Sequence, residues 1–236
     1  MKIKISISNY GSNQLWCLER MLEEFSKFKK YTLDITEYTT EKTERKHHRF
    51  GLKIGQNLPY QCRPHMAKAI NDFDLFLYNE NDHLITEENI DAFVEHQATL
   101  PFHFVSGFIR YEERDSEQIL LDPNPFWGKL INKNYGDYFS LVNNHQGCWL
   151  LTRDHLRYCI KSGEFLHRTG RGPYGCLEQG ATDPYNRCGL TKVFPSDPEK
   201  LKKHLILHLP KKYSLQPQWI SHGIKTSNLR ELLTYS

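Results

Sequence analysis

The sequence predicts an α/β protein with a mostly parallel central sheet and an irregular C-terminal half, and three observations support this fold class. Residues 3–7 alternate between apolar and polar side chains, as a half-buried strand does, and residues 15–25 carry apolar side chains at helical spacing. A buried-strand run at residues 73–78 begins a second strand-and-helix pair. No change in composition marks a linker, so we expect one domain over residues 1–236.

Composition excludes several classes of protein. Hydrophobic residues make up 39% of the chain and charged residues 25%, which is typical of a globular protein rather than a disordered one. With 31 Lys and Arg against 28 Asp and Glu, the formal charge of +3 is too balanced for a dedicated nucleic-acid-binding protein. The apolar runs fall short of the roughly 20 residues that cross a bilayer, so we expect a cytoplasmic protein without a transmembrane segment.

The six cysteines form no C-x-x-C pair, which argues against a zinc ribbon and a thioredoxin-type motif. We expect reduced thiols, as in the cytosol. Cys176 and Cys188 are the pair to examine for a disulfide, because a turn-rich loop separates them.

The first elements read as a strand, a polar loop and an amphipathic helix. The loop at residues 9–13 has turn and N-cap chemistry, and a second strand at residues 31–38 completes a right-handed βαβ unit. In such sheets the ligand crevice lies beyond the carboxyl ends of the strands. Residues 39–57 are rich in basic side chains and predict either a solvated loop or a mobile flap over an anionic ligand.

The second unit of this kind consists of the strand at residues 73–78, an acidic tip and a helix that follows Thr86, whose sequence resembles a capping box. Residues 170–189 contain five glycines and predict a loop around one short helical turn. The other elements that we expect are a short helix at 64–70, a strand over 102–112, a turn-rich stretch at 113–137, a strand at 148–151 and a helix at 152–160.

The most informative motif is the acidic tip, which contains Glu80 and Asp82. Two carboxylates separated by one residue at a strand end project to the same side of the turn. A hard divalent cation prefers such oxygen ligands and keeps further sites for water and phosphate oxygens. The alternative is a solvated turn that precedes a capped helix.

Residues 74–86, which include this tip, resemble the metal-motif strand of GT-A glycosyltransferases. Further segments look like parts of poorly characterised GT-A-type proteins, namely 107–112, 145–147 with 151–153, and 187–193. The resemblance covers roughly residues 1–210 and departs from the usual D-x-D pattern in having Glu first. It implies a GT-A-like (Rossmann-like) domain in which residues 1–100 bind the nucleotide sugar and residues 101–236 bind the acceptor.

The resemblance implies that Glu80 and Asp82 hold Mn²⁺ or Mg²⁺ on the diphosphate of a nucleotide sugar, with Asp82 as the direct ligand. The expected activity is transfer of a sugar, of the hexosyltransferase type and by inversion, from a UDP-sugar to a hydroxyl on a glycan, lipid or protein. A noncatalytic sugar-nucleotide or glycan-binding module of the same fold is the alternative. A metal-dependent phosphoryl-transfer enzyme or nuclease would need more clustered carboxylates than the sequence shows.

Five residues are implied as ligand contacts. In GT-A folds the loop after the first strand lies against the nucleotide, so Asn9, Tyr10 and Gly11 are candidates for nucleotide binding. Tyr10 either stacks on a base or packs against the sheet. Arg63 is a candidate contact for the diphosphate or ribose, or a surface ion pair. His208 follows a strand-like run and is either a further metal ligand or an imidazole with a structural role.

Catalysis by inversion needs a carboxylate that takes the proton of the acceptor hydroxyl. Glu178 and Asp183 are the candidates, with Glu178 preferred because Asp183 precedes Pro184 and could instead start a turn. His145 and Gln146 are candidate contacts for the acceptor sugar, or else stabilise a loop.

Overall fold

The computed structural model describes residues 1–123, 130–143, 145–167 and 176–234, and it also leaves out the side chains of residues 176 and 177. The chain divides into two compact units, each formed from two segments. The first unit comprises Met1–Asn81 and Gly147–Leu190, and the second comprises Asp82–Gln146 and Thr191–Ser236. These units do not follow the predicted halves at residues 1–100 and 101–236, and the binding roles given to those halves stay predictions.

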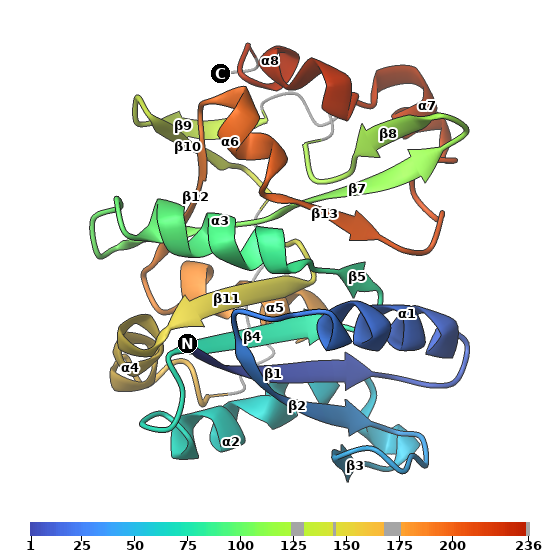
Figure 1. Cartoon of the computed structure of the whole chain (residues 1–236), viewed down its shortest axis with the longest axis vertical. Helices are drawn as coiled ribbons and strands as arrows, with labels where there is room; N and C mark the ends of the chain where they lie inside the picture. Colours follow the sequence, from blue (N-terminus) through green and yellow to red (C-terminus); the bar gives the residue numbers. More distant parts are fainter. Residues whose placement is uncertain (124–129, 144, 168–175, 235–236) are drawn as a thin grey trace. The chain divides into compact units, whose positions relative to one another are not determined.

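The first unit contains the mostly parallel central sheet, which confirms the predicted α/β class. Its strands run in the order β11-β4-β1-β2-β3, and β1 lies between β2 and β4 (Figure 1). All neighbours pair in parallel except β11, which is antiparallel to β4. The strands are β1 Lys2–Asn9, β2 Thr32–Thr39, β3 His47–Arg49, β4 Leu75–Glu80 and β11 Cys148–Thr152. The helices are α1 Leu15–Ser26, η1 Leu52–Cys62, α2 Arg63–Lys68, α4 Arg153–Lys161 and α5 Cys176–Asn186.

Strand β1 is more deeply buried than the alternation of its residues predicts. It is buried from Ile3 to Asn9 on both faces, as a central strand of a parallel sheet usually is. The buried ammonium of Lys4 donates to Asp34 Oδ1 at 2.7 Å and to Thr36 Oγ1 at 3.0 Å. These hydrogen bonds compensate for burial of the Lys4 ammonium, which the alternating sequence pattern predicted to face solvent.

The second unit holds two four-stranded sheets, in the orders β6-β12-β10-β9 and β5-β13-β7-β8. The strands are β5 His83–Leu84, β6 Phe104–Ser106, β7 Ile109–Arg114, β8 Glu117–Leu120, β9 Ile131–Asn134, β10 Tyr138–Leu141, β12 Thr191–Pro195 and β13 Leu205–His208. The helices are α3 Glu87–Gln97, α6 Pro198–Lys202, α7 Pro217–His222, η3 Thr226–Asn228 and α8 Leu229–Leu232. Among the described residues, no helix has the length and apolar character that a membrane crossing requires.

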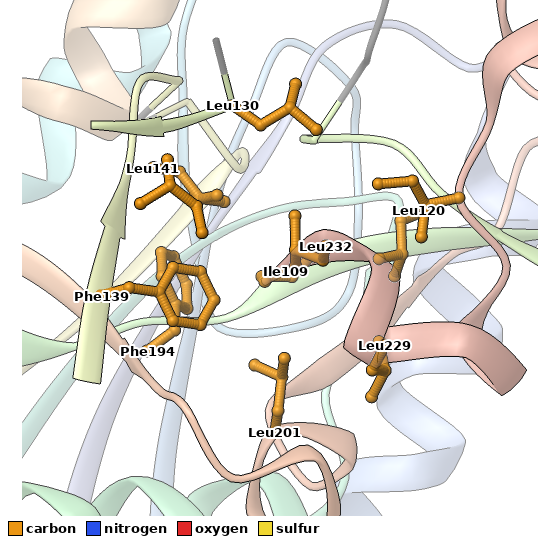
Figure 2. Close-up of a cluster of buried hydrophobic side chains, with 11 residues drawn as sticks. Ile109, Leu120, Leu130, Phe139, Leu141, Phe194, Leu201, Leu229 and Leu232 are labelled. Carbon is orange, nitrogen blue, oxygen red and sulfur yellow. The ribbon is translucent and has the colours of Figure 1, made fainter. Parts of the chain in front are cut away.

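An apolar cluster joins the sheets of the second unit to its C-terminal helices (Figure 2). Phe139 of β10 packs against Phe194 of β12 with ring centroids 5.6 Å apart, and Leu201, Leu229 and Leu232 bring α6 and α8 to the same core. Burial of these side chains stabilises the unit through the hydrophobic effect. The C-terminal segment is therefore part of the folded unit.

Several elements differ from the sequence-based expectation. The strand expected over residues 102–112 is two strands, β6 and β7, interrupted at Gly107, where a Cβ would lie 2.6 Å from the Lys192 side chain. The turn-rich stretch contains β8 and β9, and the glycine-rich stretch contains the helix α5. The helix α3 begins as predicted, because the Thr86 hydroxyl accepts a hydrogen bond from Asn89 N in a capping box.

Among the described residues, Cys17, Cys62, Cys148, Cys159 and Cys188 form no disulfide. The side chain of Cys176 lies outside the described residues, and so does the possible disulfide between Cys176 and Cys188.

Candidate metal centre and nucleotide-binding residues

Strand pairing in the second unit brings Asp82, His83 and His208 together. The short strand β5 pairs antiparallel with β13, in a register that places His83 directly opposite His208. Residues directly opposite in an antiparallel pair project to the same face. The backbone N–H of Leu209 donates to the carbonyl of Asp82 at 2.9 Å, which fixes Asp82 beside the same pair.

The three side chains converge at the distances that a shared ion requires. One potential ligand atom from each residue lies within 4.8 Å of the other two. Asp82 Oδ1 is 3.2 Å from His83 Nδ1, and Asp82 Oδ2 is 3.4 Å from His208 Nε2. Both imidazoles are buried, and the side chain of Asp82 is 13% exposed. The arrangement offers one carboxylate and two imidazoles from one edge of a sheet.

Glu112 on β7 orients the imidazole of His208 through a contact with its Nδ1. Its Oε1 lies 2.6 Å from His208 Nδ1, and the residue is fully buried. The same carboxylate accepts backbone N–H bonds from Ser214 at 2.7 Å, from Tyr213 at 3.1 Å and from Lys212 at 3.2 Å. With Nδ1 bound to a carboxylate, Nε2 is the nitrogen of His208 that faces Asp82. Metal-bound histidines are commonly oriented by such a carboxylate.

The protonation states of Asp82 and His83 suit metal binding, whereas His208 would have to lose a proton. Burial lowers the pKa of His83 well below its usual value, so this imidazole is neutral near pH 7. Burial opposes ionisation of Asp82, but the neighbouring imidazoles of His83 and His208 outweigh it and lower its pKa. Burial alone would lower the pKa of His208, whereas its bonds to Asp82 and Glu112 raise it. His208 would have to lose this proton to hold a metal ion through Nε2.

Arg110 and His145 lie next to this cluster. The Arg110 guanidinium pairs with the buried Asp122, with 2.8 Å between Arg110 Nε and Asp122 Oδ1, and it also donates to the carbonyl of His145 at 3.0 Å. Burial, followed by the charges of Arg110 and Lys192, lowers the pKa of His145 to about 3. His145 is thus neutral and close enough for the Asp82 charge to act on its pKa.

The other predicted acceptor contact, Gln146, is buried. Its carbonyl oxygen accepts from the Lys192 ammonium, and its amide donates to the carbonyl of Asn143 at 2.9 Å. These bonds give Gln146 a structural role in the second unit, and its contact with a sugar stays a prediction.

Two of the three predicted metal ligands, Asp82 and His208, are in the described cluster, together with His83, which the sequence analysis missed. Glu80 ends β4 in the first unit, where its backbone N–H donates to the carbonyl of Gly147 at 3.0 Å. The described cluster does not include Glu80, and its role as a ligand stays a prediction. The adjacency of His83 to Asp82 was the only local signal for the third member of this cluster.

The loop after β1 presents one of the three predicted nucleotide contacts to solvent. Asn9 is buried, where its amide donates to Glu37 Oε1 at 2.8 Å and its carbonyl oxygen accepts from Asn81 at 2.7 Å. Gly11 has φ of +76°, a conformation that favours glycine. Tyr10 is 53% exposed.

A hollow of about 510 Å³ in the first unit is lined by two residues that follow β2 and by the segment from the end of β3 to the start of η1. One of the lining residues is Leu52, whose carbonyl accepts from the Tyr10 hydroxyl at 3.4 Å. Thr40, another lining residue, accepts from the backbone N–H of Gly11 at 3.0 Å. The hollow therefore adjoins the loop that follows β1.

Arg63 and Asp183 form a buried ion pair in the first unit. Arg63 Nη1 lies 2.8 Å from Asp183 Oδ2, and both side chains are 1% exposed. The same nitrogen donates to the carbonyl of Phe165 at 2.8 Å. Glu178, in the first turn of α5, is only half-buried and is the more accessible of the two candidate bases. The contacts of Arg63 and Asp183 support a structural role, and the functions predicted for them are untested.

No protein-family model matches the chain, and no curated protein matches it. One similar solved structure is a glycosyltransferase involved in the glycosylation of the major capsid of PBCV-1, with 12% identity and a TM-score of 0.39 over 89% of this chain and 95% of that chain. Another is the glycosyltransferase GlyE of Streptococcus pneumoniae TIGR4, with 12% identity and a TM-score of 0.39 over 98% of this chain and 59% of GlyE. Likeness at this level carries no argument about function, which has to rest on the site.

Proposed function

We propose that Asp82, His83 and His208 bind a divalent metal ion and that the protein is a metal-dependent glycosyltransferase whose donor is a nucleoside-diphosphate sugar. The observation that carries the proposal is the cluster of one carboxylate and two imidazoles. It directly follows a buried strand whose sequence resembles the metal-motif strand of GT-A enzymes. The UDP-sugar donor, the hydroxyl acceptor on a glycan, lipid or protein, and inversion at the anomeric carbon belong to the same proposal.

The donor set favours Mn²⁺ over Mg²⁺, the two ions that the sequence suggests. Mg²⁺ prefers oxygen ligands, whereas imidazole nitrogen suits transition metals. His83 is neutral and buried, and Glu112 holds His208 with Nε2 toward Asp82, so little rearrangement is needed to bind an ion. The ion would act as a Lewis acid that stabilises the departing diphosphate.

We assign binding of the nucleobase of the donor to Tyr10. Its ring is more than half exposed beside the hollow in the first unit, and an exposed aromatic ring can stack on a nucleobase. Asn9 supports this loop through a buried hydrogen bond from its side-chain amide to Glu37, and Gly11 supports it through its positive φ. Their contribution to nucleotide binding is to hold Tyr10 in place.

We assign Glu178 as the base that accepts the proton of the acceptor hydroxyl. Asp183 is less suited to this role because its carboxylate is buried against Arg63. His145, neutral and close to the cluster, is the proposed hydrogen-bond partner of the acceptor. A neutral imidazole can donate or accept such a bond without adding charge.

The test is nucleotide binding by thermal shift with UDP, GDP and CDP, each with and without Mn²⁺. Ligands that bind the folded state raise the melting temperature by mass action. We expect a shift with UDP that depends on Mn²⁺ and disappears in Asp82→Ala. The matched control is Asp154→Ala, which removes a carboxylate whose side chain is 75% exposed. Unchanged Mn²⁺-dependent UDP binding by Asp82→Ala would refute the proposal.

A noncatalytic sugar-nucleotide-binding module is the other outcome that this experiment separates. Release of UDP from a UDP-sugar in the presence of Mn²⁺ supports an enzyme, and its loss in Glu178→Gln with intact UDP binding supports Glu178 as the base. UDP-sugar binding without any turnover, and with no effect of Glu178→Gln, would support the binding module instead.

A further inference from the structure

A second hollow, of about 340 Å³, lies wholly within the second unit, against the helices α3 and α6 that Figure 1 shows there. We call it the α3–α6 pocket. Its wall on α3 includes Glu95 and His96, and its wall at the end of α6 includes Lys200, Lys203 and His204. None of these residues belongs to the candidate metal centre.

The two histidines of the α3–α6 pocket are joined through Ser106. His204 Nδ1 lies 2.9 Å from the carbonyl of Gly107, which can only accept, so Nδ1 carries the proton. Ser106 Oγ lies 3.4 Å from His204 Nδ1 and 2.9 Å from His96 Nδ1. Ser106 thus bridges the two imidazoles, and with the proton of His204 on Nδ1, its Nε2 is an acceptor.

Both imidazoles are neutral near pH 7. Burial lowers the pKa of His96 to about 4, with a smaller contribution from the charge of Lys200, and burial lowers the pKa of His204 to about 3. The histidines therefore supply hydrogen bonds to a ligand but no charge.

The positive charge of the pocket comes from Lys200 and Lys203. Both side chains are exposed, and within the described part of the chain no ion pair or hydrogen bond engages either ammonium group. Lys202, on the same helix, differs because its ammonium lies 2.7 Å from Glu199 Oε1. Glu95 also lines the pocket, so two cations and one anion among the described lining residues give it a net positive charge.

We propose that the α3–α6 pocket binds a small molecule that carries a phosphate or carboxylate group, with the oxyanion between Lys200 and Lys203 and its remaining polar atoms bonded to His96 and His204. The hollow is large enough for such a ligand, and its lining includes the apolar Ala92 and Pro195. Neither ammonium group forms an ion pair or hydrogen bond within the described residues, although the charge of Lys200 acts on Asp197, so both can contact an external anion.

Calorimetric titration of the whole chain with inorganic phosphate, and separately with acetate, tests this site at constant ionic strength. We expect saturable binding of at least one anion, and the comparison identifies which oxyanion the pocket prefers. In the double variant Lys200→Ala/Lys203→Ala the dissociation constant should rise about tenfold, because two exposed charge contacts are lost. Glu95→Gln should lower the dissociation constant, because it removes the only carboxylate among the residues described as lining the pocket.

Lys202→Ala is the matched control, since it removes a lysine from the same helix that already has a protein partner. Its dissociation constant should equal that of the unmodified protein. Three results would overturn the proposal: no saturable binding of either anion, equal affinity in the double variant, or an equal loss in Lys202→Ala. These lysines are exposed, so the variants should stay folded, and circular dichroism checks this directly.

Discussion

Glu112→Gln isolates the contribution of the carboxylate that supports His208. Glutamine keeps the shape of the side chain but replaces one acceptor oxygen with an amide NH₂ group. Glu112 accepts hydrogen bonds from four groups, the imidazole and three backbone N–H groups, and it is fully buried. One oxygen cannot accept all of them, and the amide opposes at least one donor.

The expected losses follow from these contacts. A hydrogen bond to a charged group contributes about 1.5–3 kcal/mol, so we expect the metal-free protein to lose about 2 kcal/mol of its free energy of unfolding. Loss of a carboxylate behind a metal-bound histidine weakens metal binding by roughly tenfold to a hundredfold. Because the glutamine oxygen can still accept from His208 Nδ1, the lower end of that range is expected.

Two assays separate the two losses. Urea unfolding without metal gives the stability, and calorimetric titration with Mn²⁺ gives the affinity of the folded variant. Glu113→Gln is the control, because Glu113 is the next residue of β7 and is exposed. A double-mutant cycle with His208→Gln should show that the two substitutions together weaken Mn²⁺ binding by less than the sum of their separate effects. Equal Mn²⁺ affinity in Glu112→Gln and the unmodified protein would show that this carboxylate does not position a ligand.

Three further predictions concern the stability of each unit. Asp183→Asn should cost about 3 kcal/mol or more in urea unfolding, because it leaves the Arg63 charge buried without its carboxylate; a stable variant would argue for a role other than structural. Gly180→Ala should cost about 1–3 kcal/mol, because its Cβ would lie 2.4 Å from Cβ of Pro59, and an unchanged urea midpoint would show that α5 can shift. Burial lowers the pKa of His204 to about 3. Its contribution to the free energy of unfolding is therefore complete above the unfolded pKa near 6.5 and declines by at most about 1.4 kcal/mol per pH unit as the pH falls below that value. In urea unfolding from pH 7 to 5, the free energy of unfolding of His204→Gln should depend less steeply on pH than that of the unmodified protein.

The central sheet could be predicted because its signals are local. Alternating or buried apolar runs, separated by a loop and an amphipathic helix, are visible within short windows of sequence. The same local signals gave the capped start of α3. They misjudged β1, since burial of Lys4 depends on Asp34 in a neighbouring strand.

The metal centre could be predicted only in part. Asp82 stands out because it follows a buried strand, whereas His83 and His208 meet only when β5 pairs with β13, which is distant in the chain. The carboxylate of Glu112 comes from a third strand of that sheet. No pattern within a short window can reveal contacts of this kind.

The helix α5 was missed for a different reason. Its sequence contains Gly180 and Pro184, residues that usually interrupt helices. Gly180 is required by close packing on Pro59, and its carbonyl accepts from Trp149 at 3.1 Å. Tertiary contacts here override the local preference.

Pulsed electron paramagnetic resonance of bound Mn²⁺ tests the metal centre most directly, because it detects ¹⁴N nuclei that coordinate the ion. We predict nitrogen couplings from the two imidazoles of His83 and His208, with one coupling lost in His83→Gln. A spectrum at saturating Mn²⁺ that shows only water and other oxygen ligands, and that His83→Gln and His208→Gln leave unchanged, would contradict the assignment.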